Sequence, residues 1–247
     1  MSTTHHGHAA HHGEAAAADE LEVVVAEPTL TRGREERLAF RIERSDGEPV
    51  RDYDATHERR MHLIVVRRDL TGFQHLHPEL AGDGTWSTPI TLSDPGEYRL
   101  FADFSSDGGA RTLTRDLHVE GDADAAALPA PAPVATSDGG DRVELERIGG
   151  HAAIAQHATQ PANAGEPSTL RFAITRDGER VEVEPYLGAS GHLVALREGD
   201  LAFLHVHPSG DGVEFETTFP TAGRYRLFLQ YKVDGAVQTV AFTQVVK

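Results

Sequence analysis

Two histidine triplets have a spacing that suits metal binding. In each triplet, one histidine is followed thirteen residues later by the first member of a His-x-His pair. The triplets are His62, His75 and His77, and His192, His205 and His207. Imidazole nitrogens are common ligands of transition metals, and three of them can share one ion. A His-x-His pair occurs often by chance, so the argument depends on the whole triplet recurring.

The residues around each triplet predict the strands that would bring its histidines together. Residues 62–67 and 73–77 read as antiparallel strands of a hairpin with Asp69 and Leu70 at its tip, and residues 197–200 form the turn of the second copy. This register places the first histidine of the triplet opposite the last. Directly paired residues share a face of the sheet, as do residues two apart, so all three imidazoles converge. A slip of one residue would separate them.

The ligand chemistry favours Cu(II) or Zn(II) as the bound ion, with Ni(II) and Co(II) as further candidates. The chain has no cysteine, which excludes thiolate zinc sites, type 1 copper, iron–sulfur clusters and disulfides. Met61 is expected to point away from the triplet, so a thioether-rich Cu(I) site is not indicated. Glu79 and Asp103 are candidate auxiliary ligands in the first copy. The aligned residues of the second copy, Ser209 and Gln230, lack a carboxylate.

Histidines outside the triplets fall into two groups. Residues 1–20 read as a flexible tail whose histidines either capture or relay metal or are a product of low-complexity drift. These histidines are His5, His6, His8, His11 and His12. The others, which have no counterpart in the opposite copy, are interpreted as ordinary surface residues. They are His57, His118, His151 and His157.

The second half of the chain repeats the first, as four ordered matches indicate. The matching segments are AFRI (39–42) with RFAI (171–174), HLIV (62–65) with HLVA (192–195), HLHP (75–78) with HVHP (205–208), and PGEYRLF (95–101) with AGRYRLF (222–228). We therefore expect an internal duplication.

Short runs rich in Val, Thr, Phe, Tyr and Leu between Gly, Pro, Asp and Asn predict an all-β protein of two tandem immunoglobulin-like β-sandwich domains. Residues 21–119 form the first domain and residues 142–247 the second. The Ala-, Pro- and acid-rich segment 120–141 is the expected linker. Tyr98 and Tyr225 are expected to form tyrosine corners, and Trp86 to fill the core of the first domain.

The net charge of −16 and a pI near 5.3 argue against nucleic acid as a partner, because like charges would meet. No run reaches the ~20 apolar residues of a membrane-spanning helix. The N-terminus lacks the basic-then-apolar order of a secretory signal, so the chain as written is expected to be soluble and cytoplasmic.

Three classes of function fit these features. The first is a non-catalytic protein with one metal site per domain, which buffers or delivers the ion. The second is a metalloenzyme that uses the open coordination position of a three-histidine site, although no carboxylate shared by both copies offers a general base. The third is an adhesion or scaffolding module in which the histidines are incidental.

The HLIVV, HLHP and GxYRLF segments resemble a largely uncharacterised group of bacterial tandem β-sandwich proteins, often exported and often actinobacterial. More loosely, the chain is similar to small copper-handling β-sandwiches of the CopC-like and YtkA-like type. The resemblance implies an immunoglobulin-like or cupredoxin-like fold, an extracytoplasmic location, and a role in copper or heavy-metal binding, transport or tolerance. A metal transporter or acceptor protein is then the expected partner. The chain departs from the copper proteins in lacking methionine ligands.

Overall fold

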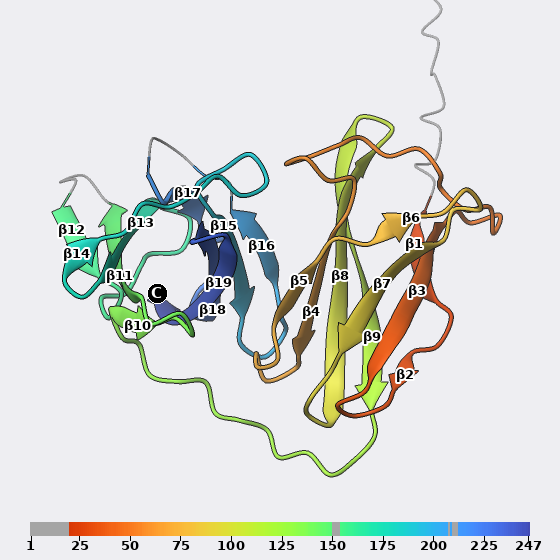
Figure 1. Cartoon of the computed structure of the whole chain (residues 1–247), viewed down its shortest axis with the longest axis horizontal. Helices are drawn as coiled ribbons and strands as arrows, with labels where there is room; N and C mark the ends of the chain where they lie inside the picture. Colours follow the sequence, from red (N-terminus) through yellow and green to blue (C-terminus); the bar gives the residue numbers. More distant parts are fainter. Residues whose placement is uncertain (1–19, 150–153, 207, 209–211) are drawn as a thin grey trace, which may run out of the picture.

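The computed structural model describes residues 20–149, 154–206, 208 and 212–247. Within these residues every regular element is a β-strand, and the strands form two tandem immunoglobulin-like sandwiches that lie side by side (Figure 1). The predicted all-β tandem fold is therefore confirmed. No helix in the described ranges has the length and apolarity to cross a membrane.

The first sandwich consists of two sheets. One sheet runs in the order β1 (Glu22–Val25), β3 (Glu35–Glu43), β7 (Trp86–Thr91) and β6 (Glu79–Leu80). The other runs in the order β2 (Thr29–Leu30), β9 (Gly109–Val119), β8 (Gly96–Ser106), β4 (His62–Arg67) and β5 (Gln74–Leu76). Alternate residues of both sheets fill the core between them, as expected for strands with one face inward.

The second sandwich repeats this plan. Its first sheet runs in the order β10 (Val134–Thr136), β11 (Arg142–Gly149), β13 (Pro167–Arg176) and β14 (Glu179–Arg180), with β12 (Ile154–His157) on β11 and β17 (Glu214–Thr218) on β13. Its second sheet runs in the order β16 (Phe203–Val206), β15 (His192–Arg197), β18 (Gly223–Val233) and β19 (Ala236–Val246).

The aromatic residues singled out in the sequence have the predicted structural roles. Trp86 is 2% exposed in the core of the first sandwich, edge-on to Tyr53 with ring centroids 4.9 Å apart. The Tyr98 hydroxyl donates to the backbone carbonyl of Asp94 at 2.8 Å. In the second copy, the Tyr225 hydroxyl donates to the carbonyl of Thr221 at 2.9 Å. Both tyrosine corners are therefore present.

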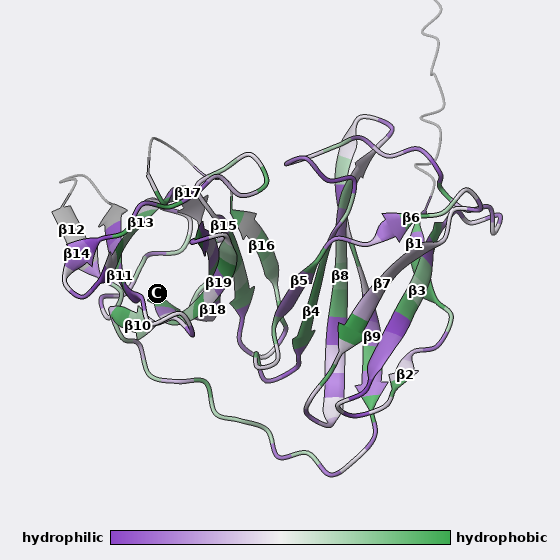
Figure 2. Cartoon of the chain, in the orientation of Figure 1, coloured by the Kyte–Doolittle hydropathy of each residue, from purple (hydrophilic) through white to green (hydrophobic). Residues whose placement is uncertain are grey.

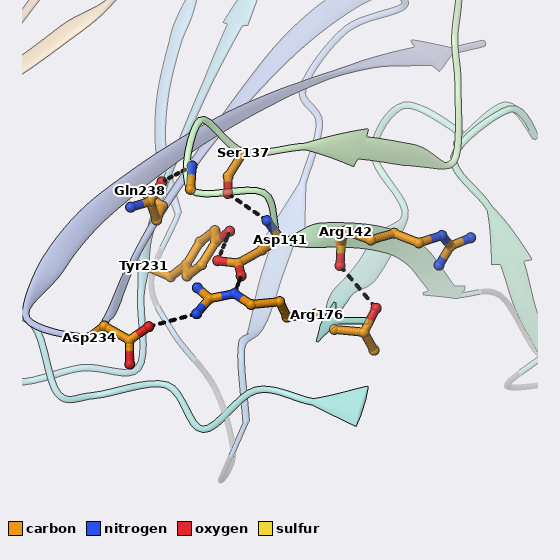
Figure 3. A network of polar contacts seen from close by, with 9 residues as sticks. Ser137, Asp141, Arg142, Arg176, Tyr231, Asp234 and Gln238 are labelled. Atoms are coloured by element: carbon orange, nitrogen blue, oxygen red, sulfur yellow. Dashed lines mark hydrogen bonds and ion pairs between the residues drawn. The ribbon is translucent and has the colours of Figure 1, made fainter. Parts of the chain in front are cut away.

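The second sandwich begins earlier than the sequence indicated, because β10 lies inside the expected linker and pairs with β11. The turn after β10 is fixed by Asp141, which is 0% exposed (Figure 3). Its carboxylate accepts hydrogen bonds from Arg176 Nε at 2.8 Å and from the Tyr231 hydroxyl at 3.1 Å. The boundary at residue 141 was wrong because a strand of three residues next to an Ala- and Pro-rich segment is too short to show a strand pattern.

A third apolar cluster joins the two sandwiches. Strand β4 is buried on both faces, and its ribbon is mostly hydrophobic in Figure 2. Leu63 and Val65 enter the first core, whereas Ile64 and Val66 pack in the cluster between the domains. The other buried members of this cluster are Leu70, Phe101, Leu128, Val194, Leu196, Leu201 and Phe228. The sheet that carries the first triplet therefore faces the corresponding sheet of the second copy.

Two aromatic stacks show that this interface is nearly symmetric. Phe73 stacks on Phe228 with ring centroids 4.1 Å apart, and Phe101 stacks on Phe203 at 5.0 Å. In the repeat alignment Phe73 corresponds to Phe203, and Phe101 corresponds to Phe228. The two stacks are thus the same contact made in both directions, which is the signature of a self-complementary, two-fold interface.

Candidate metal centre

The hairpin that carries the first triplet has the predicted register. Leu63 pairs with Leu76, and Ile64 pairs with His75. Continuing this ladder by one residue sets His62 opposite His77, and both lie on the same face as His75. The turn differs from the prediction, because the Leu70 amide donates to the Arg67 carbonyl and the centre of the turn is one residue earlier than expected. A slip of one residue would turn Leu63 and Val65 out of the first core and the polar His62 into it, which disfavours any other register.

His62 and His75 direct one nitrogen each at the other. His62 Nε2 lies 3.0 Å from the backbone carbonyl oxygen of Thr56, which can only accept, so Nε2 carries the proton. His75 Nδ1 lies 2.7 Å from Gln230 Oε1 and is likewise the donor. In the neutral rings, His62 Nδ1 and His75 Nε2 therefore both present lone pairs, and these two atoms are 3.1 Å apart. Two facing acceptors repel each other unless a cation lies between them.

His77 supplies the third ligand atom. Its Nε2 is buried and has no hydrogen-bond partner among the described residues. One nitrogen from each of His62, His75 and His77 lies within 4.8 Å of the other two. In a tetrahedral site with metal–nitrogen bonds of ~2.1 Å, the ligand nitrogens are about 3.4 Å apart. Small side-chain rotations that move the nitrogens by about 1 Å would therefore complete the geometry.

The surroundings keep two of these imidazoles neutral. Burial, followed by the nearby His77 and His62, holds the pKa of His75 well below its usual value. Burial, followed by His62 and Arg59, lowers the pKa of His77 to about 3. A neutral imidazole is the form that ligates a metal ion, so near neutral pH these rings are in the ligating state.

Residues from the second sandwich reach the same place. His192 lies with its ring centroid 6.3 Å from that of His62 and 6.1 Å from that of His75. His57, interpreted from sequence as a surface residue, is half-buried with its ring 6.1 Å from His62 and 5.7 Å from His192. That interpretation was wrong, because a residue without a counterpart in the repeat can still face the interface between the copies. Strand β4, whose apolar run does not alternate, was the available signal for such a face.

Neither of the other two candidate ligands joins the triplet. Glu79 is exposed on β6, in the sheet that does not carry the triplet, and Asp103 pairs with His62 across β4 and β8 and accepts from Thr112 at 2.8 Å. Neither belongs to the group of three ligand atoms found among the described residues. Met61 is 1% exposed and packs in the first core, as its predicted orientation requires. The His118 side chain is exposed, and its Nδ1 lies 2.7 Å from Glu97 Oε1.

The second triplet is described in part. His192 Nε2 lies 2.9 Å from the Tyr186 carbonyl oxygen, repeating the contact of His62 with Thr56. The backbone of His205 pairs with Val194, which is the register of the first copy. His207 and Ser209 lie outside the described residues, as do His151 and the tail histidines His5, His6, His8, His11 and His12. The second site therefore stays a prediction.

Comparisons with known proteins agree with the tandem organisation. Two stretches of the chain, residues 16–121 and 149–247, match the sequence model of one protein family. A search of curated protein sequences finds no match.

Among solved structures, similar ones include a Salmonella alpha-2-macroglobulin reacted with methylamine (13% identity, TM-score 0.32), the Escherichia coli adhesin FdeC (15%, 0.27) and a chimeric titin Z1Z2-Z1Z2 tandem (17%, 0.22). The alignments cover 94%, 95% and 92% of this chain, and 15%, 66% and 100% of those structures. The chain thus spans under two thirds of the length of the first two. At these identities and scores the matches say nothing about function.

Proposed function

The chain belongs to the family described as a domain of unknown function (DUF8832), and we propose that it binds a transition metal ion, Cu(II) or Zn(II), through His62, His75 and His77. The proposed role is to buffer or deliver the ion to a transporter or acceptor protein. We propose a non-catalytic role because no carboxylate shared by both copies offers a general base.

One observation carries the proposal. His62 Nδ1 and His75 Nε2 are 3.1 Å apart, while the opposite nitrogen of each ring is hydrogen-bonded to an oxygen acceptor. A proton between the two rings would create a buried imidazolium, which the low pKa of His75 opposes. A divalent ion accepts both lone pairs and that of His77 Nε2, which otherwise has no described partner.

The convergence of the three rings also distinguishes this proposal from an adhesion or scaffolding module with incidental histidines. Incidental histidines would have no reason to meet on one buried face, and His62 is only 2% exposed. Three nitrogen ligands without thiolates suit Cu(II) and Zn(II), since affinity at such sites rises toward copper.

The test is metal titration of a full-length parent in which the five tail histidines are replaced by alanine. Calorimetry and elemental analysis should give bound Cu(II) or Zn(II), and a second equivalent if His192, His205 and His207 form a site. His75→Ala with His205→Ala should abolish most of the binding. The exposed His118→Ala is the matched control and should leave binding unchanged. A parent that binds no metal in stoichiometric amount would contradict the proposal.

A further inference from the structure

A residue of the second sandwich determines which nitrogen His75 offers. Gln230, on β18, is 8% exposed and accepts from His75 Nδ1 at 2.7 Å across the domain interface. With the proton held on Nδ1, the lone pair of His75 is on Nε2, the nitrogen that faces His62. Without this acceptor nothing in the first sandwich, among the described residues, fixes the ring in that state.

Gln230 is itself held in place. Its amide nitrogen donates to Thr239 Oγ1 at 3.1 Å, on the neighbouring strand β19, and Thr239 is its direct partner in the ladder. This contact orients the amide so that the oxygen, the acceptor, points at His75. On its other side Gln230 pairs with His192 of β15. The residue thus connects the first triplet to the strand that begins the second triplet.

The interface that holds Gln230 against His75 contains aromatic residues that belong to neither sandwich core. Phe101 and Phe228 belong to the cluster between the sandwiches and stack on Phe203 and Phe73. Neither is a member of the two sandwich cores. Burial of these rings supplies the apolar contact that keeps Gln230 against His75.

We propose that Gln230 is a positioning residue for the first triplet, so that metal binding there is coupled to docking of the two sandwiches. The inference rests on the proposed metal site. Gln230 acts through His75 and does not contact the ion. Because coupling is reciprocal, any factor by which docking strengthens metal binding is also the factor by which metal strengthens docking.

The test uses a full-length parent with the tail histidines, His205 and His207 replaced by alanine, so that one triplet remains. In this background Gln230→Leu should weaken Zn(II) or Cu(II) binding by 10–100-fold, the usual effect of losing a partner of a ligating histidine. Gln230→Glu keeps an acceptor oxygen and should bind the ion at least as tightly as the parent. Gln238→Leu is the matched control: it lies on the same β-hairpin and loses a bond to Gly139 but does not contact His75.

Two further measurements separate positioning from a general structural effect. Long-range proton–nitrogen NMR spectra of the metal-free parent should show His75 with its proton on Nδ1. This measurement is made on the parent itself, so it does not depend on whether a Gln230 variant folds. Phe101→Ala with Phe228→Ala removes both interface stacks while leaving both cores intact, and should weaken metal binding at least as much as Gln230→Leu.

The outcomes distinguish failure of this inference from failure of the metal site. If the one-triplet parent binds no metal, the proposed function fails. If it binds metal, but Gln230→Leu matches the Gln238→Leu control, Gln230 is not a positioning residue. A His75 proton on Nε2 in the NMR spectra would overturn the inference by itself. Unchanged affinity in the double phenylalanine variant would remove the coupling to docking.

Discussion

Acidification should destabilise the metal-free first sandwich through His75 and His77. Both have a pKa lowered in the folded state, mainly by burial, while the unfolded chain titrates near pH 6.5. Below that value the unfolded state takes up protons that the folded state does not, so stability is complete above pH 6.5 and falls as the pH drops towards the folded values.

The magnitude follows from this linkage. A histidine that stays neutral in the folded state at pH 5 loses about 2 kcal/mol of stabilisation between pH 7 and pH 5. For the two residues together we expect about 3 kcal/mol, because His77 is only half-buried and solvent screens part of its shift. The window stops at pH 5, above the range in which the carboxylates of the chain protonate.

Urea unfolding in the presence of a chelator measures this effect. Trp86 is the single tryptophan and lies in the first core, so its fluorescence reports unfolding of that sandwich. The parent should lose about 3 kcal/mol more between pH 7 and pH 5 than His75→Gln with His77→Gln, whose amides do not titrate. His118→Gln, at an exposed site, is the control. Parallel pH profiles for the parent and the double variant would refute the reasoning.

Three other perturbations test other parts of the structure. Asp141→Ala removes the acceptor of Arg176 Nε and of the Tyr231 hydroxyl, while Arg176 keeps its ion pair with Asp234, and should destabilise the second sandwich by about 2 kcal/mol in chemical denaturation. Tyr98→Phe and Tyr225→Phe each remove one tyrosine-corner hydrogen bond and should each cost about 1 kcal/mol in the same assay. If the interface contacts repeat in both directions, Asp103→Asn should weaken binding at the second triplet by about tenfold, measured by calorimetry with His75→Ala silencing the first.

The sequence was informative where strand pairing is local. The hairpin interpretation gave the register of the 62–67 and 73–77 segments, and β4 and β5 pair in that register. The turn was harder to predict. Leu70 has a φ of 67° and follows a turn closed by its own amide and the Arg67 carbonyl, so the loop is longer than the two-residue loop that was expected.

What could not be predicted concerns contacts between segments far apart in sequence. Gln230 and His75 are 155 residues apart, and no local pattern links an amide in one repeat to an imidazole in the other. His57 was dismissed because it has no counterpart, yet a contact across an interface does not require one. The short β10 strand pairs with β11, and the turn between them is held by the partners of Asp141, which come from β13 and β18.

Duplication explains why the candidate site lies where the two copies meet. In a self-complementary interface, a residue near the two-fold axis faces its own counterpart or a close neighbour of it. His62 and His192 are such counterparts, and their ring centroids are 6.3 Å apart.

A histidine triplet on the interface sheet of one ancestral domain would thus be brought opposite a second triplet by duplication alone. Divergence then acts on the aligned residues Asp103 and Gln230, where one copy has a carboxylate and the other an amide. If Asp103 contacts the second triplet as Gln230 contacts the first, its charge would make the ligating imidazole more basic, and the two triplets would bind metal with different strength.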